Sequence, residues 1–314
     1  MPDSTSTLPP LAISASGLTK TYAASKKMPA KQALKGVDLA VPRGSIFGLL
    51  GPNGAGKSTF INILAGLVNK SSGAVGVWGI DADRNPREAR AALGVVPQEI
   101  NMDPFFTPRE TLELMAGFYG VPSSERRTDE ILEALGLGDK KHAYVRQLSG
   151  GMKRRLMVAK AMVHAPPILI LDEPTAGVDV ELRQTLWQFI RELNGQGHTI
   201  LLTTHYLEEA EELCERVAML KAGRIVALDR TANLLRADAQ RRVELRLSPS
   251  RLPAALQPRL AGEKEGAFLL NLHDYAELEG MLAEIRQAGV QIESFCVRQP
   301  DLEEVFIQTM RGQS

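Results

Sequence analysis

The stretch Gly51-Pro-Asn-Gly-Ala-Gly-Lys-Ser-Thr59 determines the fold expected for this chain of 314 residues. It fits the phosphate-binding pattern G-x-x-x-x-G-K-[ST]. The apolar run Ser45–Leu50 precedes it, and a helical pattern of Phe60, Ile61 and Leu64 follows it. A strand, a glycine-rich loop and a helix in that order predict a loop that wraps phosphate groups at the carboxyl end of a buried strand.

Each residue type in this loop has a physical role. The glycines permit a tight turn whose backbone N–H groups face phosphate oxygens, and the helix N-terminus adds its dipole. We expect Lys57 to reach the β- and γ-phosphates and the Ser58 hydroxyl to hold Mg²⁺. The predicted phosphate-site residues of the loop are Gly51, Asn53, Gly54, Gly56, Lys57, Ser58 and Thr59.

A second apolar run supplies two carboxylates. Ile168–Leu171 is followed directly by Asp172 and Glu173. Because ligands of α/β folds bind at the carboxyl ends of the strands, Asp172 is expected to position the magnesium shell. Glu173 points elsewhere and is the expected general base that polarises a water in line with the γ-phosphate.

A third element, Leu148-Ser-Gly-Gly-Met152, precedes a helical pattern with Met152, Leu156, Ala159 and Val163 on one face. Ser149, Gly150 and Gly151 therefore form a helix N-terminus suited to an anion.

Composition excludes several classes of protein. Lysine plus arginine and aspartate plus glutamate both total 37, so a net charge of zero gives no electrostatic basis for binding nucleic acid. The two cysteines, Cys214 and Cys296, lack metal-ligand spacing and predict no disulfide framework. Apolar runs are too short for a membrane span, and the first ten residues do not resemble a secretory signal; we expect them to form a disordered tail.

Short apolar runs alternate with helical patterns over residues 11–228, which predicts an α/β domain with a mainly parallel sheet. The expected strands are Leu11–Tyr22, Leu34–Val41, Ser45–Leu50, Ile168–Leu171, Thr199–Thr204, Val217–Leu220 and Arg224–Leu228. The last two flank a turn and predict an antiparallel hairpin.

Residues 104–144 have helical periodicity and predict a helical insertion, part of a subdomain at about residues 100–160. Its first helix is expected to begin at the capping box of Thr107 and Glu110, and its second to span Asp129–Leu135. Residues 229–314 predict a separate α+β unit that resembles a ferredoxin-like module. Its expected elements are strands at 243–247, 268–272 and 290–297 and helices at 275–287 and 301–310.

The Leu-Ser-Gly-Gly element, placed between a P-loop and an Asp-Glu strand end, resembles the signature of ATP-binding cassette ATPases over residues 11–228. The resemblance implies that ATP and Mg²⁺ are the ligands. It assigns Tyr22 to stacking on adenine and Gln98 to the Q-loop beside the metal. It assigns Asp179 to the D-loop and His205 to the switch histidine that contacts the γ-phosphate. The basic loop Lys26–Lys31 is longer than the family pattern.

In this family the signature of one subunit closes over the nucleotide held by the P-loop of another. The resemblance therefore implies a homodimer with two ATP sites, one signature Ser149–Gly151 at each. It also implies a separate transmembrane permease, in two copies, that docks near Glu99–Phe106. The chain would then lie at the cytoplasmic face of the plasma membrane, held there by the permease.

Three further stretches resemble the ATPases of ABC-2 type exporters, and this resemblance implies export: Thr203-Thr-His-Tyr-Leu-Glu-Glu-Ala210, Arg216-Val-Ala-Met-Leu-Lys-Ala-Gly223 and Leu302-Glu-Glu-Val-Phe306. Within that group the YadG-type branch is most similar, through Val68-Asn-Lys-Ser-Ser-Gly73, Val96-Pro-Gln-Glu99 and Met152-Lys-Arg-Arg-Leu-Met157. The alternatives are an importer ATPase of the methionine type and a non-transport ATPase. The C-terminal unit is either a cap that stabilises the dimer or a ligand sensor.

Overall fold

A computed structural model of the chain describes residues 8–24, 29–176, 180–237, 241–264, 266–272, 274–298 and 301–311. The chain divides into two compact units, residues 1–229 and 230–314. The boundary predicted from the sequence lies one residue before this division.

The first unit is built on a six-stranded sheet with the order β10-β9-β3-β8-β7-β6. Its strands are β3 (Ile46–Leu50), β6 (Leu93–Val96), β7 (Ile168–Asp172), β8 (Thr199–Thr204), β9 (Arg216–Lys221) and β10 (Arg224–Arg230). All pairs from β9 to β6 are parallel. Every residue of β3 and β8 is buried, which is why these strands are continuous apolar or β-branched runs rather than alternating ones. Ala222 and Gly223, both with positive φ, form the turn between β9 and β10.

A second, four-stranded sheet has the order β2-β1-β4-β5 and is antiparallel. Its strands are β1 (Leu11–Tyr22), β2 (Lys31–Pro42), β4 (Ser72–Val77) and β5 (Ile80–Asp81). The basic loop predicted at Lys26–Lys31 ends before Lys31, because Lys31 already pairs with Tyr22 of β1. The tail expected over residues 1–10 also ends early, since the Pro10 carbonyl accepts a hydrogen bond from Arg43 N at 3.1 Å; residues 1–7 lie outside the described part of the chain.

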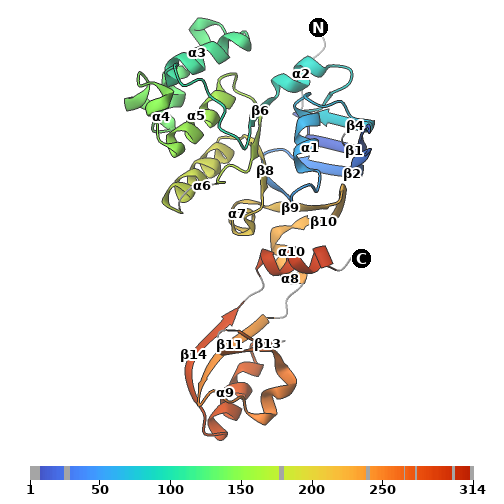
Figure 1. The fold of residues 1–314 in the computed structure, drawn as a ribbon, viewed down its shortest axis with the longest axis vertical. Helices are drawn as coiled ribbons and strands as arrows, with labels where there is room; N and C mark the ends of the chain where they lie inside the picture. Colours follow the sequence, from blue (N-terminus) through green and yellow to red (C-terminus); the bar gives the residue numbers. More distant parts are fainter. Residues whose placement is uncertain are drawn as a thin grey trace. The chain divides into compact units, whose positions relative to one another are not determined.

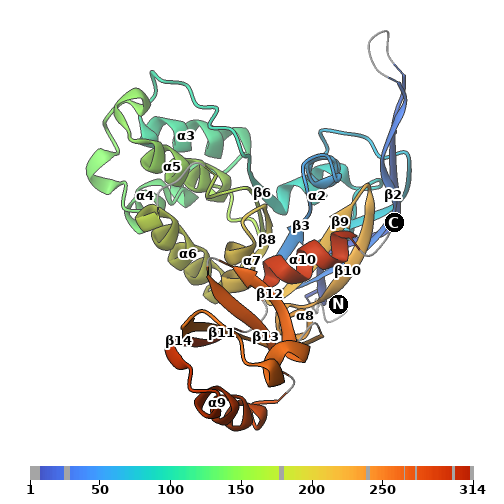
Figure 2. The same ribbon diagram turned by 60° about the horizontal axis from the view of Figure 1, so that its bottom comes forward.

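The helices of the first unit are α1 (Lys57–Leu64), α2 (Pro86–Ala91), α3 (Pro108–Phe118), α4 (Thr128–Ala134), α5 (Gly150–Met162), α6 (Val180–Gly195) and α7 (Leu207–Leu213), with 3-10 turns η1 (Ser123–Glu125), η2 (Gly138–Lys140) and η3 (Val145–Gln147). Figures 1 and 2 show α3, α4 and α5 gathered on one side of the parallel sheet and the β1, β2 and β4 strands on the other. The capping box is present at α3: Thr107 and Glu110 each accept a hydrogen bond from the other's backbone N–H.

Two clusters of buried apolar side chains form the cores of the first unit. One joins the antiparallel sheet, α1 and the parallel sheet, and includes Phe47 and Phe60. The other lies inside the helical insertion, where Leu112 of α3 and Leu132 of α4 pack with Leu156 of α5. Helix α5 therefore packs as part of the helical insertion. It is also the element that precedes strand β7 in the chain.

The second unit has a four-stranded antiparallel sheet with the order β12-β13-β11-β14. Its elements are α8 (Thr231–Ala237), β11 (Arg241–Ser248), η4 (Ala254–Arg259), β12 (Leu260–Lys264), β13 (Ala267–Leu272), α9 (Glu277–Gln287), β14 (Gln291–Arg298) and α10 (Leu302–Arg311). The prediction missed α8, η4 and β12. The 3-10 helix η4 occupies the position of the first α-helix in a ferredoxin-like module. The assignment of this unit as a ferredoxin-like module therefore stays a prediction.

Neither cysteine is part of a disulfide. Cys214 is buried, and that burial raises the pKa of its thiol. Cys296 lies in β14 and is exposed. Across the described ranges, no helix is both long enough and apolar enough to cross a bilayer.

Candidate nucleotide site

The predicted phosphate loop, Gln98, Glu173 and His205 gather because four neighbouring parallel strands end at one edge of the sheet. The phosphate loop follows β3, His205 follows β8, Glu173 follows β7 and Gln98 comes soon after β6. The order β3-β8-β7-β6 places these four strand ends side by side. An edge of this kind is where open α/β sheets bind their ligands.

The phosphate loop has the backbone that the sequence predicts. Gly54 and Gly56 have φ of 79° and 118°, a region that favours glycine. A side chain at Gly56 would approach the Ala33 carbonyl oxygen to 2.8 Å, so the loop also needs glycine for close packing. The first intrahelical bond of α1 runs from Phe60 N to Gly56 O at 2.9 Å, so the preceding N–H groups are available to an anion at the helix N-terminus.

Lys57 is folded back over this loop. Its side chain is 6% exposed, and Nζ donates a hydrogen bond to Gly51 O at 2.6 Å. Burial lowers the pKa of Lys57, while the carboxylates of Glu173 and Asp172 oppose that shift. The ammonium group is therefore a partly desolvated cation, and a phosphate close to it would interact more strongly than in bulk water.

Glu173 is the point on which the polar side chains converge. Gln98 Nε2 donates to Glu173 Oε2 at 2.7 Å, and His205 Nδ1 lies 3.1 Å from the same oxygen. The Glu173 side chain is 8% exposed and its backbone has φ of 49°, which is strained for a residue with a Cβ. Its N–H donates to Thr203 O at 2.9 Å, so the strand beside it holds this conformation.

Asp172 precedes Glu173 on β7 and accepts a hydrogen bond from the Thr203 hydroxyl. Burial raises the pKa of Asp172, and the hydrogen bond from Thr203 partly offsets that effect. The carboxylate is thus fixed in place but poorly solvated. A cation beside it would relieve that cost.

Arg154 is a buried residue beside this site that sequence reasoning missed. Its guanidinium, on α5, donates to Pro97 O at 3.0 Å, to Gln98 O at 2.8 Å and to Glu173 O at 3.0 Å. The residue is 4% exposed, and burial lowers the pKa of its guanidinium. One buried side chain therefore ties the loop around Gln98 and the turn at Glu173 to the helix that follows the Leu-Ser-Gly-Gly element.

A cavity of about 190 Å³ lies over the loop. Its lining residues are Tyr22, Lys31, Ala33, Pro52, Asn53, Gly54, Gly56, Lys57, Ser58, Thr59, Gln98 and Glu173. The Tyr22 hydroxyl lies 3.5 Å from Thr59 Oγ1, which places the aromatic ring at the mouth of the loop. Three lining residues were not in the set predicted from the sequence: Lys31, Ala33 and Pro52.

The Leu-Ser-Gly-Gly element does not join this cavity. Ser149 caps α5 by accepting a hydrogen bond from Met152 N at 3.2 Å. Ser149 and Gly150 are exposed, and a Cβ at Gly150 would meet open space. The lining of the cavity contains neither these residues nor Gly151. The remaining predicted residue, Asp179, lies outside the described residues.

The side chains near the loop fit a magnesium ion that is bound largely through phosphate. Within the described ranges, no cluster of three or more histidine, cysteine or acidic side chains could cage a metal by itself. Mg²⁺ in phosphate sites is typically held by one or two protein oxygens plus phosphates and water. Ser58 is exposed in the cavity lining, and Asp172 is a desolvated carboxylate at the neighbouring strand end.

Comparisons with known proteins agree with this geometry. The family model described as ABC transporter matches residues 34–176. The daunorubicin/doxorubicin resistance ATP-binding protein DrrA of Streptomyces peucetius is 35% identical over 96% of this chain and 93% of its own length. The Nod factor export ATP-binding protein I of Rhizobium meliloti is 37% identical over 96% of this chain and 88% of its own length.

The chain is also similar to solved structures of ATP-binding cassettes. A dimeric, post-hydrolysis ATP-binding cassette bound to ADP and Pi superposes with a TM-score of 0.63 at 30% identity, covering 70% of this chain and 98% of that one. An ATP-binding subunit of an ABC transporter superposes with a TM-score of 0.64 at 30% identity, covering 74% of this chain and 93% of that one.

Proposed function

Because this chain belongs to the ATP-binding cassette family of transporters, we propose that it hydrolyses ATP, with Mg²⁺, to drive a separate membrane permease of an exporter. The relatives compared above are named for drug resistance and for Nod factor export, which favours export over the importer alternative. The single observation that carries the chemistry is the convergence of Gln98 and His205 on one oxygen of Glu173 beside the phosphate loop.

The residues act on the phosphate groups as follows. Lys57 and the N–H groups at the start of α1 stabilise the negative charge of the phosphates. Glu173 accepts the proton of the attacking water, and Gln98 and His205 hold its carboxylate in position. Mg²⁺, when bound near Ser58 and Asp172, neutralises charge that develops on the phosphate oxygens.

Phosphate release by the purified chain tests this function. We expect hydrolysis that requires Mg²⁺, stops with EDTA and is lost in Lys57→Ala. Exposed Lys140, which makes only a surface ion pair with Asp139, gives the matched control Lys140→Ala, for which we expect the parental rate. Hydrolysis that persisted in EDTA would contradict the assignment of the metal.

The complete catalytic unit is a homodimer in this proposal. The exposed Ser149 of each copy faces the ATP held by the phosphate loop of the other copy. The support is that the element is solvent-exposed and absent from the cavity lining of its own chain, and that a similar cassette was solved as a dimer. Two copies give two equivalent sites related by two-fold symmetry.

The permease contact is proposed at a groove of about 580 Å³ near the Gln98 loop. Asn101 and Met115 line it, together with Leu67 and Phe118, which are 76% and 75% exposed. Large apolar side chains with such exposure are typical of an interaction surface. Phe105 and Phe106, also exposed, lie in the segment that the sequence predicted for this contact.

Co-purification of the tagged chain with membrane proteins in mild detergent tests this contact. We expect Phe118→Asp and Phe106→Asp to lose the permease while the isolated chain keeps its ATPase rate, because both side chains are outside the nucleotide cavity. Leu8→Asp, at an apolar residue that is 59% exposed and so lies between Phe118 and Phe106 in exposure, is the control that should keep the permease. Retention by both phenylalanine variants would place the contact elsewhere.

We further propose that the chain is peripheral at the cytoplasmic face of the plasma membrane and that residues 230–314 stabilise the dimer. An alkaline carbonate wash should release the chain from membranes that contain the permease. Deletion of residues 230–314, a unit that is compact by itself, should weaken dimerisation if the unit is a cap. If it is a sensor, the deletion should leave dimerisation intact and abolish inhibition by a ligand.

A further inference from the structure

His205 reaches Glu173 from a half-exposed position. Its side chain is 45% exposed, and its Nδ1 lies 3.1 Å from Glu173 Oε2. Across the described ranges, this is the one polar contact that the imidazole makes. A half-exposed ring with one polar contact can adopt other rotamers, so a defined position requires a second group that packs against the ring.

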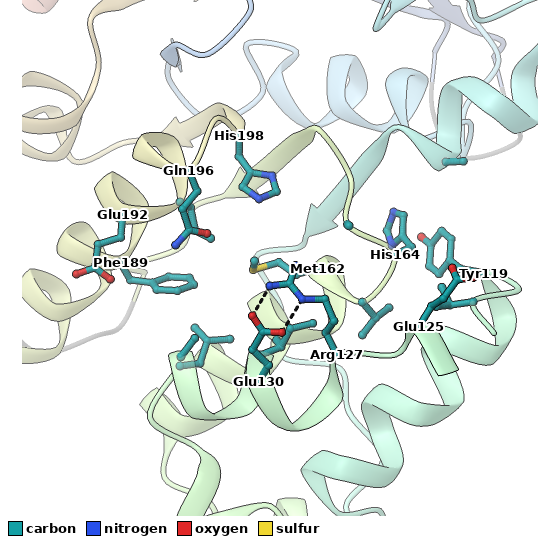
Figure 3. Close-up of a pocket in the computed structure, with 18 of the residues that line it drawn as sticks. Tyr119, Glu125, Arg127, Glu130, Met162, His164, Phe189, Glu192, Gln196 and His198 are labelled. Atoms are coloured by element: carbon teal, nitrogen blue, oxygen red, sulfur yellow. Dashed lines mark hydrogen bonds and ion pairs between the residues drawn. The ribbon is translucent and has the colours of Figure 1, made fainter. Parts of the chain in front are cut away.

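Another histidine of the same unit shows how an imidazole is held. His164 stacks on Tyr119 with the ring centroids 3.6 Å apart, and its Nε2 lies 3.0 Å from Leu93 O. Figure 3 shows this pair beside a cavity of about 620 Å³, whose lining contains neither His205 nor Glu173. A tyrosine ring and one polar contact therefore hold an imidazole away from the nucleotide site.

Tyr206 supplies the corresponding ring for His205. The two ring centroids are 4.1 Å apart, and the ring planes are tilted by 36°. The guanidinium carbon of Arg183, on α6, lies 4.9 Å from the centroid of the Tyr206 ring. A cation at this distance is attracted to an aromatic ring, so Arg183 restricts the movement of Tyr206. The contacts thus run from Arg183 to Tyr206, from Tyr206 to His205 and from His205 to Glu173.

Arg183 has no stronger partner among the described residues. Its side chain is 19% exposed, and its Nε is buried without a hydrogen-bond partner. Its ion pair with Glu208 is long, at 3.8 Å, and the side chain of Glu208 is 75% exposed. Ion pairs of such exposed groups contribute little to stability. The ring of Tyr206 is therefore the better-defined contact of this guanidinium.

The backbone of Tyr206 is fixed from both sides. Its N–H donates to Thr204 Oγ1 at 2.9 Å, at the end of β8. Its carbonyl accepts a hydrogen bond from Glu209 N at 3.1 Å, in the first turn of α7. Thr204 is 1% exposed and Glu209 is fully buried, so both partners belong to the interior. The Tyr206 ring thus extends from a rigid turn.

We propose that Tyr206 is a positioning residue for ATP hydrolysis: its ring, held by Arg183, keeps the imidazole of His205 on Glu173. This inference rests on the proposed function, which assigns His205 and Glu173 to hydrolysis. Tyr206 does not line the cavity over the phosphate loop, so it acts through His205 rather than on the nucleotide. Loss of the ring should therefore lower kcat and leave KM for ATP unchanged.

Steady-state hydrolysis by the full-length chain with Mg²⁺ tests this role. Tyr206→Leu should lower kcat about tenfold, with KM within about twofold of the parent. Tyr206→Phe keeps the ring and should keep the parental kcat. Tyr119→Leu is the matched control, because it removes the other tyrosine–histidine stack and should leave kcat unchanged. A parental kcat in Tyr206→Leu, or an equal loss in Tyr206→Phe, would overturn the proposal.

A double variant separates positioning from a general structural effect. His205→Ala already lacks the imidazole, so the addition of Tyr206→Leu should lower the residual kcat by less than about twofold. A further tenfold loss would show that Tyr206 acts through other residues, and it would overturn the assignment. Thermal unfolding verifies that each variant is folded.

Proton NMR of the histidine rings detects the contact without any measurement of activity. The ring signals of His205, identified by their loss in His205→Ala, should move in Tyr206→Leu and stay in place in Tyr119→Leu. Unmoved signals in Tyr206→Leu would overturn the inference and leave the proposed function intact. A parent chain that hydrolysed no ATP would overturn the proposed function and this role with it, whereas the NMR shift would still confirm the contact.

Discussion

The phosphate-loop half of the site and the Leu-Ser-Gly-Gly half differ in how much of their structure the single chain supplies. Lys57, Arg154 and Glu173 are at most 7% exposed, and each is held by a hydrogen bond to a loop or turn that follows a strand of the parallel sheet. Ser149 is exposed, and its hydroxyl accepts one hydrogen bond, which comes from its own helix. The first half is preorganised within one chain, whereas in the proposed dimer the second half would become part of a site only by contact with another copy.

The largest expected effect separates binding from chemistry in the buried half. Glu173→Gln keeps the size of the side chain but removes the proton acceptor, so hydrolysis should fall by about 10²- to 10⁴-fold. ATP binding should persist, because Lys57 and the loop are unchanged, and the ATP-bound dimer should accumulate. Light scattering coupled to gel filtration measures the dimer, and phosphate release measures the rate. A variant that hydrolysed ATP at the parental rate would refute the role of Glu173.

The next effect removes the buried connection between the two halves. Arg154→Ala leaves the carbonyls of Pro97, Gln98 and Glu173 without their donor. The free energy of unfolding should fall by about 3 kcal/mol, and hydrolysis should fall with it because Gln98 and Glu173 lose their alignment. Urea titration gives the stability. The control is the exposed Arg84→Ala, which should change stability by less than about 0.5 kcal/mol.

A smaller effect should mark the exposed half. Ser149→Ala removes the N-cap of α5 and should cost about 1 kcal/mol of stability. ATP affinity of the dilute monomer should be unchanged, since Ser149 is not in the cavity of its own chain, whereas hydrolysis at concentrations that favour the dimer should decrease. Fluorescent nucleotide titration and phosphate release distinguish the two. Weaker ATP binding by the monomer would contradict the comparison.

The smallest effect concerns the buried carboxyl of Glu209 in α7. Glu209 of α7 is fully buried and accepts a hydrogen bond from Trp187 Nε1 at 3.1 Å. Burial raises the pKa of Glu209 above its ordinary value of 4.5. The contribution of the protonated Glu209 carboxyl to the free energy of unfolding is therefore fully present below about pH 4.5. This contribution is lost as the pH rises through the pKa of Glu209 in the folded state.

Glutamine cannot ionise. As the pH rises from 4.5 to 8, the free energy of unfolding of Glu209→Gln should therefore increase by about 1 kcal/mol relative to that of the parent. Denaturant unfolding at several pH values measures the difference. A stability difference that stayed constant with pH would show that Glu209 does not titrate in this range.

Sequence reasoning reached the phosphate site because its residues follow local patterns. A strand, a glycine loop and a helix are adjacent around Lys57, and an apolar strand leads directly to Glu173. Strand β4 was missed because Gly73 and Gly76 interrupt the alternation of apolar residues that indicates a strand.

Arg154 was missed for a different reason. It stands in the run Lys153-Arg154-Arg155, which has the composition of a solvated helix face. Only the tertiary fold shows that Arg154 points at three carbonyls of other segments. The roles of such buried cations depend on partners far away in the sequence, and no local pattern encodes them.

The difference in exposure between the two cysteines allows one of them, Cys296, to be labelled selectively with a probe. Cys214 is buried and has a raised pKa, so a maleimide reagent should leave it unmodified, whereas Cys296 is exposed in the second unit. A nitroxide spin label should therefore attach at one position per chain without mutagenesis. In an assembly of two chains, pulsed electron paramagnetic resonance would then report the separation of the two C-terminal units through each step of the ATP cycle.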